Sequence, residues 1–439
     1  MPRDHRSNPM PYADRFVDVA ALLPGHDLPW LRDLRSAAIE RVRQLGLPSV
    51  RAEGWKYTNL NALNAVAFQP SRPGSTLVAT DRLLPDLGGH RVVIVDGRHR
   101  PELSSISLPA GLSIASLSNL LRDDQEIARP LFEEQYASDD SLNALNLAFA
   151  TDGFVMRVAP AAVIDAPVEV VHVSTAEGTA IHTRNFVIAG PGSSSAIIES
   201  FVGTQGAIYW THCVSDIRVG AGATLRRYKD QQEDTRAFHT AADRVRVDPD
   251  ARYESFALAT GAGLSRHEIA LTLDGQGASC QIDGGYLARG RQHVDNTTEI
   301  RHAQPHTTSG EVYKGVLDDQ ARGVFQGRIV VEKDAQKADG HQLSKTILLS
   351  DRAEIDTKPE LEIFADDVKC SHGATAGELD EDALFYLRAR GIDLAEARRL
   401  LVEAFISDAL ANVSNAMVRT AFERRIGSWM IGNAGGRTA

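Results

Sequence analysis

The chain is poor in cysteine: Cys213, Cys280 and Cys370 are the three among 439 residues. Such an odd, sparse set does not build a disulfide framework, and it suits a reducing compartment. No Cys-x-x-Cys pair occurs, so there are too few ligands for a self-contained zinc ribbon or ferredoxin-like cluster. Cys213 and Cys280 lie in strand-like runs and are expected to be buried, whereas Cys370 has charged and polar neighbours. If this protein handles a metal cluster, it must share the ligands with another chain.

Several catalytic signatures are absent as well. The chain has no Gly-x-x-x-x-Gly-Lys-Ser/Thr loop and no complete Gly-x-Gly-x-x-Gly, so it lacks a recognisable cradle for nucleotide phosphates. We therefore expect that it does not hydrolyse ATP by itself. His-Glu-x-x-His and Gly-x-Ser-x-Gly are also missing, which argues against two classes of hydrolase that a sequence can reveal.

Excess positive charge and long apolar runs are missing too. Lysine and arginine number 47 against 58 acidic residues, a net charge of -11, which argues against nucleic acid as the main partner. No run approaches the roughly 18 apolar residues of a membrane span, and no apolar signal segment follows the N-terminus. We expect no membrane association, and a cytoplasmic location is the default expectation.

The region from Phe154 to Phe364 consists of short β-branched runs separated by turns. Ala196, Ala223, Ala251 and Ala278 each follow a turn rich in glycine, proline or aspartate, at intervals of 27, 28 and 27 residues. Repeats of this length indicate a β-solenoid with one continuous core. An ordinary β-sandwich is the alternative.

Helical patterns flank this region. Residues Ala37 to Leu45 predict a helix that ends at Gly46, and after Gly377 apolar residues recur at helical spacing. Asp393 with Glu396 forms a candidate capping box. The C-terminal helices are long enough to cap the solenoid, to dock a partner, or to do both. We expect four regions: an N-terminal helical and mixed region (1–111), a connecting segment (112–153), a β core (154–366) and a C-terminal helical domain (367–439).

The segment around Cys370 carries the clearest candidate chemistry, because His372 follows the thiol by two residues and Lys369 adjoins it. A nearby lysine and histidine favour the thiolate, which is the form that binds metals and attacks sulfur. Asp366 and Asp367 oppose that shift, so the outcome depends on geometry. An exposed free thiol without a function is the alternative for Cys370.

A second cluster contains His293, His302 and His306, with Asp295 nearby. Imidazole and carboxylate together can bind a borderline metal. Such residues at strand ends more often satisfy backbone groups or face solvent, and we prefer that interpretation.

Several stretches resemble the SufB/SufD family of iron-sulfur cluster assembly proteins. They are Tyr313–Gly315, Ala321–Gly327, Glu354–Pro359, Glu53–Thr58, and the Cys370 segment with its continuation from Asp380 to Gly391. The resemblance implies a mainly β fold: a right-handed parallel β-helix flanked by N-terminal and C-terminal helical regions. This agrees with the repeat. For Glu53–Thr58, the residues favour a packed aromatic turn over a binding surface.

The resemblance also implies a scaffold subunit rather than an enzyme. It would pair with SufB through the β-helix and dock the SufC ATPase through its C-terminal helices, and SufC would supply the missing P-loop. A homodimer of the isolated chain stays open. The candidate residues for docking the ATPase are Leu384, Phe385, Leu387, Leu401 and Phe405.

By the same resemblance, Cys370 and His372 are the cluster-assembly and interface candidates, each a candidate metal ligand shared with the partner. The family implies a transient iron-sulfur cluster shared with SufB and no cofactor held tightly by the isolated chain, and it leaves flavin binding by the full complex open. SufB typically carries His-Glu-Ala-Thr where this chain has Gly373 after His372, which places the chain on the SufD branch.

A β-helix polysaccharide lyase or hydrolase is the alternative of a different class. Such enzymes usually show clustered acids or aromatic residues along an exposed groove. The aromatic content here is 6%, and no ladder of acids is visible. The scaffold interpretation is therefore favoured.

Overall fold

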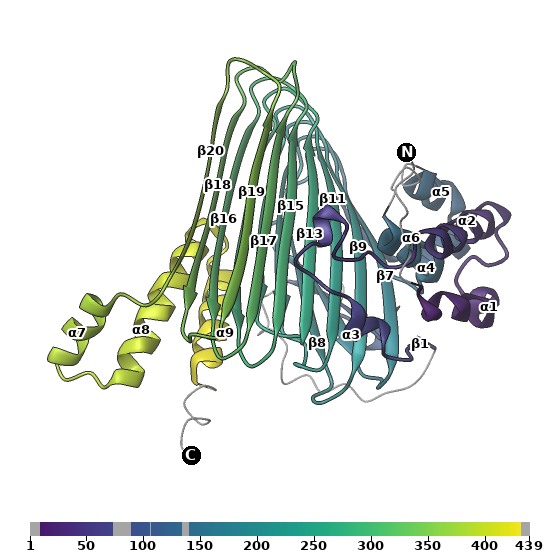
Figure 1. The fold of residues 1–439 in the computed structure, drawn as a ribbon. Coiled ribbons are helices and arrows are strands. Elements are labelled where there is room, and N and C mark those ends of the chain that lie inside the picture. The colour runs from purple at the N-terminus through teal and green to yellow at the C-terminus, as the bar shows by residue number, and fades with distance from the viewer. Residues whose placement is uncertain (1–8, 73–88, 106, 134–139, 432–439) are drawn as a thin grey trace, which may run out of the picture.

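The computed structural model describes residues 9–72, 89–105, 107–133 and 140–431, and it is a β-solenoid with helices on two sides (Figure 1). Terminal parts of the expected N-terminal and C-terminal regions, 1–8 and 432–439, lie outside these residues. The N-terminal helices lie on one side of the strands, and the C-terminal helices lie on the other.

Two large sheets form the solenoid. The first has the order β19 (Glu354–Ile363), β17 (Arg322–Val331), β15 (His293–His302), β13 (Leu264–Leu273), β11 (Phe238–Val247), β9 (Tyr209–Val219), β7 (Thr179–Ala189), β5 (Phe154–Val158) and β4 (Leu112–Ser116), with β1 (Gln69–Pro70) beside β7. The second has the order β20 (Lys369–Gly377), β18 (Asp339–Leu348), β16 (Thr308–Leu317), β14 (Ser279–Ala288), β12 (Arg252–Ala259), β10 (Thr224–Gln231), β8 (Ser194–Gly203), β6 (Val168–Ser174), β2 (His90–Val95) and β3 (Arg98–His99).

The helices lie towards the two ends of the chain. The α-helices are α1 (Phe16–Val19), α2 (Pro29–Leu45), α3 (Asn61–Asn64), α4 (Leu117–Asp123), α5 (Gln125–Glu133), α6 (Ser141–Phe149), α7 (Glu381–Ala389), α8 (Leu394–Ser407) and α9 (Ala416–Ile431). Short 3₁₀ segments are η1 (Pro11–Arg15), η2 (Ala20–Leu22), η3 (Glu53–Trp55), η4 (Pro101–Leu103) and η5 (Asp408–Asn412).

Consecutive strands alternate between the two sheets, and each pairs in parallel with the strand one turn earlier. The pattern runs from β5 and β6 to β19 and β20, about eight turns. This confirms the parallel β-solenoid and excludes the sandwich, because antiparallel pairing is confined to β4 with β5 and β2 with β3 among the named strands.

The alanine repeat is correct for three of its four members. Ala223, Ala251 and Ala278 are fully buried, and each immediately precedes a strand of the second sheet. Ala196 instead lies inside β8, because Ser194 pairs with Thr224. The residue equivalent to Ala223 is therefore Ser193, so the first interval in the sequence does not correspond to a turn of the solenoid.

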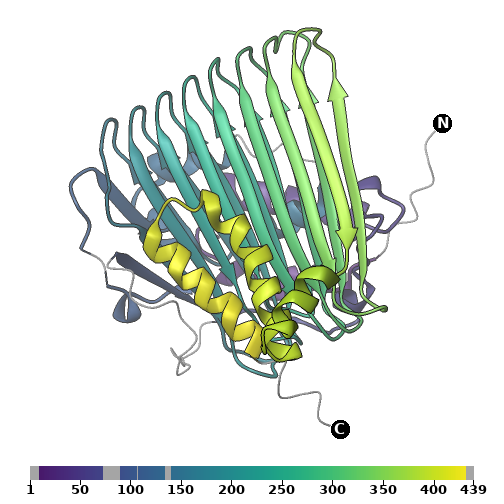
Figure 2. The ribbon, with the colours of Figure 1, turned by 90° about the vertical axis from the view of Figure 1, so that its left-hand side faces the viewer.

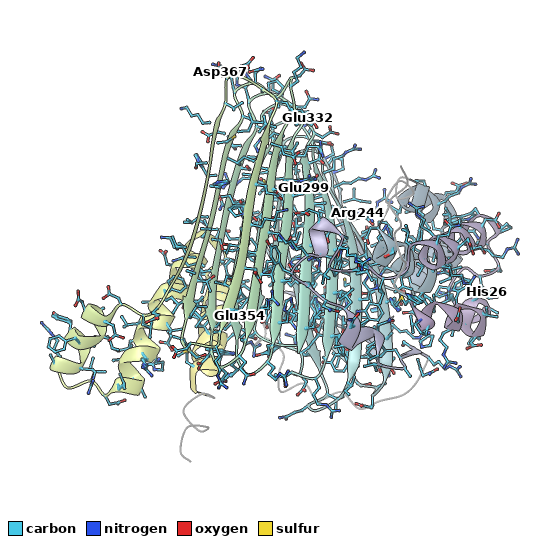
Figure 3. All side chains as sticks on the ribbon, viewed as in Figure 1. His26, Arg244, Glu299, Glu332, Glu354 and Asp367 are labelled. Carbon is cyan, nitrogen blue, oxygen red and sulfur yellow. The ribbon has the colours of Figure 1, made fainter. Side chains whose placement is uncertain are left out.

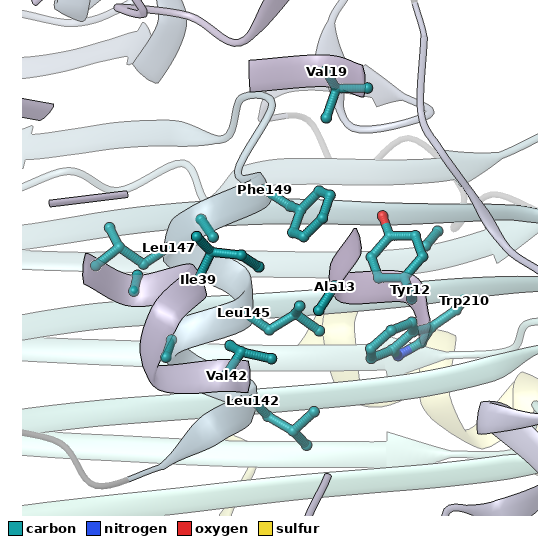
Figure 4. Packing of buried hydrophobic residues seen from close by; sticks show 14 of the residues in the cluster. Tyr12, Ala13, Val19, Ile39, Val42, Leu142, Leu145, Leu147, Phe149 and Trp210 are labelled. Atoms are coloured by element: carbon teal, nitrogen blue, oxygen red, sulfur yellow. The ribbon is translucent and has the colours of Figure 1, made fainter. Parts of the chain in front are cut away.

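Helices cover part of the outer face of each sheet. On the first sheet, Trp210 of β9 packs with Tyr12, and Leu145 and Phe149 of α6 continue the same apolar cluster (Figure 4). On the second sheet, apolar side chains such as Phe256 pack against α8 and α9, which lie across its strands (Figure 2). The helices thereby bury apolar side chains that the solenoid alone would expose.

Two expected boundaries can be compared with the structure. Helix α2 ends at Gly46, whose φ of 64° suits glycine, as the sequence predicts. The β core continues to Gly377 and not to residue 366, because Lys369–Gly377 form β20 and pair with β18. That strand consists of small and polar residues at a sheet edge, so it lacks the apolar alternation that marks an inner strand.

Among the described residues, no helix combines the length and apolarity needed to cross a membrane.

Candidate functional site

The last turn of the solenoid leaves two strand edges open. Among the described residues, β19 pairs only with β17 and β20 pairs only with β18. Both strands lie at the end of the solenoid that is far from the N-terminal helices (Figure 1). Their outer edges therefore present backbone N–H and C=O groups that can accept a further strand.

Cys370 and His372 lie side by side on the inner face of β20. Cys370 pairs with Gly340 and His372 pairs with Gln342 of β18, and both of these partners are buried. His341, between them, is exposed and contacts Ser371 on the outside. Since side chains alternate along a strand, the thiol and the imidazole point towards the interior at the open end.

The Cys370 thiol is half-buried against an apolar cluster that contains Ile329, Val331 and Ala338. Burial raises its pKa and the negative charge of Asp339 raises it further, whereas a hydrogen bond with the Gly340 backbone lowers it. The sequence left this outcome to geometry, and in the isolated chain the pKa is raised, with no contribution from Lys369 or His372.

The acids that oppose the thiolate are not those expected from the sequence. Asp367, in the loop at the tip between β19 and β20, forms an ion pair with Lys337 (Figure 3). Asp339 acts on the thiol instead, from the neighbouring strand. Sequence reasoning missed it because only the pairing of β18 with β20 brings the two residues together.

The other two cysteines are buried, as expected. Burial raises the pKa of the Cys213 thiol to about 12, and it raises the pKa of Cys280 as well. Neither is poised for chemistry, so both have structural roles.

The histidine cluster is satisfied by hydroxyl groups. His302 is buried and lies 2.8 Å from the Thr307 hydroxyl and 2.9 Å from the Ser309 hydroxyl. His293 lies 2.9 Å from the hydroxyl of Thr58. Across residues 9–431, where described, no three His, Cys, Asp or Glu side chains are grouped to hold a metal. The partners of His293 and His302 are therefore side-chain hydroxyls and not the expected backbone groups or solvent, whereas His306 is exposed.

The polar side chains behind His372 come from earlier turns of the second sheet. Gln342 of β18 is buried, and its Nε2 donates a hydrogen bond of 2.7 Å to Oε2 of Glu311 on β16. Glu311 pairs with Gln342, which pairs with His372, so the three lie in register on one face, with Glu311 and Gln342 buried and His372 exposed at the open end. Neither Gln342 nor Glu311 was a sequence candidate, because their relation to the open end depends on strand register.

The predicted docking residues of the C-terminal helices divide by exposure. Leu384 is buried. Phe405 packs against the second sheet, where the ammonium group of Lys314 on β16 lies 4.7 Å from the centroid of its ring. Leu387 and Leu401 are half-buried. Phe385 is 73% exposed on α7, which projects away from the sheets (Figure 1).

A cavity of about 1070 Å³ lies beside these helices. Its walls come from α7, α8, α9 and the loop between β18 and β19, and they include Leu349, Leu384 and Leu394. The helices that form it begin at side-chain caps: Asp380 accepts from the Ala383 N–H, and Asp393 accepts from the Glu396 N–H, each at 3.0 Å. The Asp393 cap expected from the sequence is thus present.

The sequence was compared with protein-family models and with known proteins. Residues 172–405 match the family described as "SUF system FeS cluster assembly, SufBD core domain", and residues 7–170 match "SufBD protein N-terminal region". A SufBD family iron-sulfur cluster assembly protein of Synechocystis sp. is 30% identical, with 91% of each chain covered. The iron-sulfur cluster assembly protein SufD of Escherichia coli is 29% identical over 90% of this chain and 92% of its own. SufD of Bacillus subtilis is 26% identical over 86% and 89%.

Proposed function

The chain belongs to the SufBD family of iron-sulfur cluster assembly proteins, and from that premise we propose that it is a SufD-type scaffold subunit without catalytic activity of its own. It pairs with SufB through the open end of the solenoid and docks the SufC ATPase through its C-terminal helices. The observation that carries the proposal is the placement of Cys370 and His372 together, facing inward, on the strand whose edge is unpaired.

Pairing with SufB would occupy the edges of β19 and β20. Each free edge can form main-chain hydrogen bonds with one added strand, which is the usual mode of β-strand addition. Ile363 and Phe364, at the end of β19, are 41% and 61% exposed and provide apolar area next to those edges. A SufB edge laid against this end would bury both side chains and cover Cys370 and His372.

The cluster is the cargo of this site, and its ligands would be divided between the subunits. Cys370 and His372 offer one thiol and one imidazole, whereas iron-sulfur clusters commonly need four protein ligands. The partner would therefore supply the remaining ligands, and the isolated chain would hold no cluster tightly. Opening of the interface by movement of the ATPase would expose or enclose the nascent cluster.

Docking of SufC would use the projecting part of the C-terminal helices. Phe385 and Tyr386 of α7 are 73% and 55% exposed, and Leu394 at the start of α8 is 39% exposed. Exposed apolar side chains gathered on adjoining helices are typical of a protein interface. SufC would bring the phosphate-binding loop that this chain lacks.

Co-expression with SufB and SufC from the same genome, followed by native mass determination, tests the proposal. We expect a complex that contains all three proteins. Phe385→Glu should remove SufC and leave SufB bound, whereas Val17→Glu, at an equally exposed position in α1 (74%), should change neither contact. His372→Ala should leave the complex intact and impair cluster formation. If the chain folds well and binds neither protein, the scaffold proposal is wrong, and polysaccharide cleavage should be assayed instead.

A further inference from the structure

A buried acceptor lies directly behind His372. Gln342 is 3% exposed, and its amide nitrogen donates to Glu311. Its amide oxygen, Oε1, is buried and has no hydrogen-bond partner in the described part of the chain. A buried acceptor without a donor destabilises the folded state, so an unsatisfied oxygen here calls for a donor.

The Gln342 side chain occupies the interior of the solenoid. A β-carbon added to Gly327, on the opposite sheet, would lie 1.9 Å from Gln342 Nε2, so the side chain reaches across to β17. Glycine at that position leaves the room that the amide fills. The glutamine therefore cannot turn outward to water without emptying this space.

The neighbours of Gln342 on the two sides differ. Glu311 precedes it by one turn and takes the N–H, and His372 follows it by one turn at the open end. Residues in register on adjacent strands lie about 4.8 Å apart, within reach of an imidazole and an amide on the same face. Two other residues of β20 lie on the same face. The Ala374 side chain has no hydrogen-bond donor, and the Cys370 thiol is only a weak donor.

We propose that Gln342 is a positioning residue for His372: its Oε1 accepts a hydrogen bond from one ring N–H of the imidazole. This inference rests on the proposed role of His372 in cluster assembly. The bond fixes which nitrogen carries the proton, so the other nitrogen keeps its lone pair for iron or for a cluster. Glu311 completes the row by holding the Gln342 amide in the orientation that leaves its oxygen free.

The test is nitrogen NMR of the full chain labelled with ¹⁵N-histidine, at pH 8.5 so that neutral imidazoles are compared. The His372 signals are assigned by their loss in His372→Gln. In the unmodified chain we expect both ring nitrogens at the shifts of a single tautomer. In Gln342→Met, which keeps the length and removes the acceptor, the shifts should move to an average of two tautomers.

Gln326→Met is the matched control. Gln326 is 6% exposed on β17, at the same end of the solenoid, but its amide donates to the Gly54 carbonyl on the outer face. We expect the ¹⁵N shifts of His372 in Gln326→Met to equal those in the unmodified chain. Averaged shifts in the unmodified chain, or shifts that Gln342→Met leaves unchanged, would overturn the proposal. If Gln342→Met does not fold, the unmodified chain alone decides between one tautomer and an average.

A second measurement separates this inference from the proposed function. Cluster formation by the complex is measured with His372→Ala and with Gln342→Met, for which a loss of about tenfold is expected. If His372→Ala is impaired and the tautomer does not depend on Gln342, the function stands and the positioning role fails. If the tautomer depends on Gln342 and His372→Ala forms clusters normally, the positioning role stands and the function fails.

Discussion

The guanidinium carbon of Arg266 lies 3.9 Å from the centroid of the Trp55 ring. Arg266 belongs to β13, where its guanidinium also pairs with Asp295 and Glu268. Trp55 belongs to the N-terminal segment that crosses the outer face of the first sheet, and Thr58 of that segment also contacts Asp295. The contact therefore ties this segment to the later turns of the solenoid.

Trp55→Leu should loosen the segment without unfolding the solenoid. The change keeps an apolar side chain and removes the ring that contacts Arg266, an interaction of about 1 kcal/mol. We expect backbone hydrogen exchange of residues 53–58 to accelerate by about fivefold to tenfold, as measured by mass spectrometry. The matched control is Trp429→Leu, which removes a comparable ring at 4.4 Å from Arg289 near the C-terminus. An equal acceleration in the control would contradict a local role for Trp55.

The reactivity of Cys370 should depend on Asp339. Burial, and after it the Asp339 carboxylate, raise the thiol pKa, so at pH 8 the protonated form predominates and alkylation is slow. Asp339→Asn removes the negative charge, lowers the pKa and should speed the reaction with iodoacetamide by about twofold to fivefold at pH 8. Because Cys213 and Cys280 are buried, mass spectrometry should find a single modified cysteine in the folded chain.

Asp367→Asn is the control for that experiment. Asp367 adjoins the cysteine segment in sequence but pairs with Lys337, and it does not contribute to the shift of the thiol pKa. We expect the rate of alkylation to stay unchanged. An equal acceleration by both substitutions would mean that general charge, rather than the neighbouring strand, sets the reactivity.

Some of these features could be predicted from the sequence, and others could not. The end of α2 at Gly46 and the turns before Ala223, Ala251 and Ala278 were predictable, because the signals are local: a glycine cap and turn residues at a steady spacing. Cys370 and His372 could be selected from the resemblance. Their neighbours Asp339 and Gln342 could not, because loop lengths vary between turns and only the register of β18 with β20 brings these residues together.

Blocking the edge of β20 should weaken pairing with SufB. The Lys369 N–H donates to the carbonyl of Ala338, which immediately precedes β18, so the alternate residues Cys370, His372 and Ala374 turn their backbone N–H groups to the open edge. Ala374→Pro removes one of these donors and leaves the pairing with β18 intact, and Gly373 before it tolerates the extended backbone that proline requires. We expect at least about a fivefold loss of affinity for SufB by calorimetry, since a lost donor costs about 1–3 kcal/mol.

Ala374→Val is the control for the edge experiment. It enlarges the same side chain and keeps the N–H, so it should bind SufB within about threefold of the unmodified chain. If proline and valine weaken binding equally, the side chain rather than the strand edge carries the contact, and pairing by strand addition would be wrong.

The buried carboxyl of Glu311 should make stability depend on pH. Burial raises its pKa to about 7, against hydrogen bonds from Thr298 and Gln342 that lower it. The folded state therefore binds more protons than the unfolded state between about pH 4.5 and 7, and stability falls as pH rises through that window. The loss amounts to about 1–3 kcal/mol and is complete above about pH 7.

Glu311→Gln is neutral at every pH and keeps an acceptor for the Gln342 N–H, so it should be more stable than the unmodified chain at pH 8 and similar at pH 5. Urea unfolding at both values measures this, with Glu354→Gln on the exposed start of β19 as a control that should change little. A Glu311→Gln chain that is equally destabilised at both values would show that the ionised carboxylate supports the fold, contrary to the raised pKa.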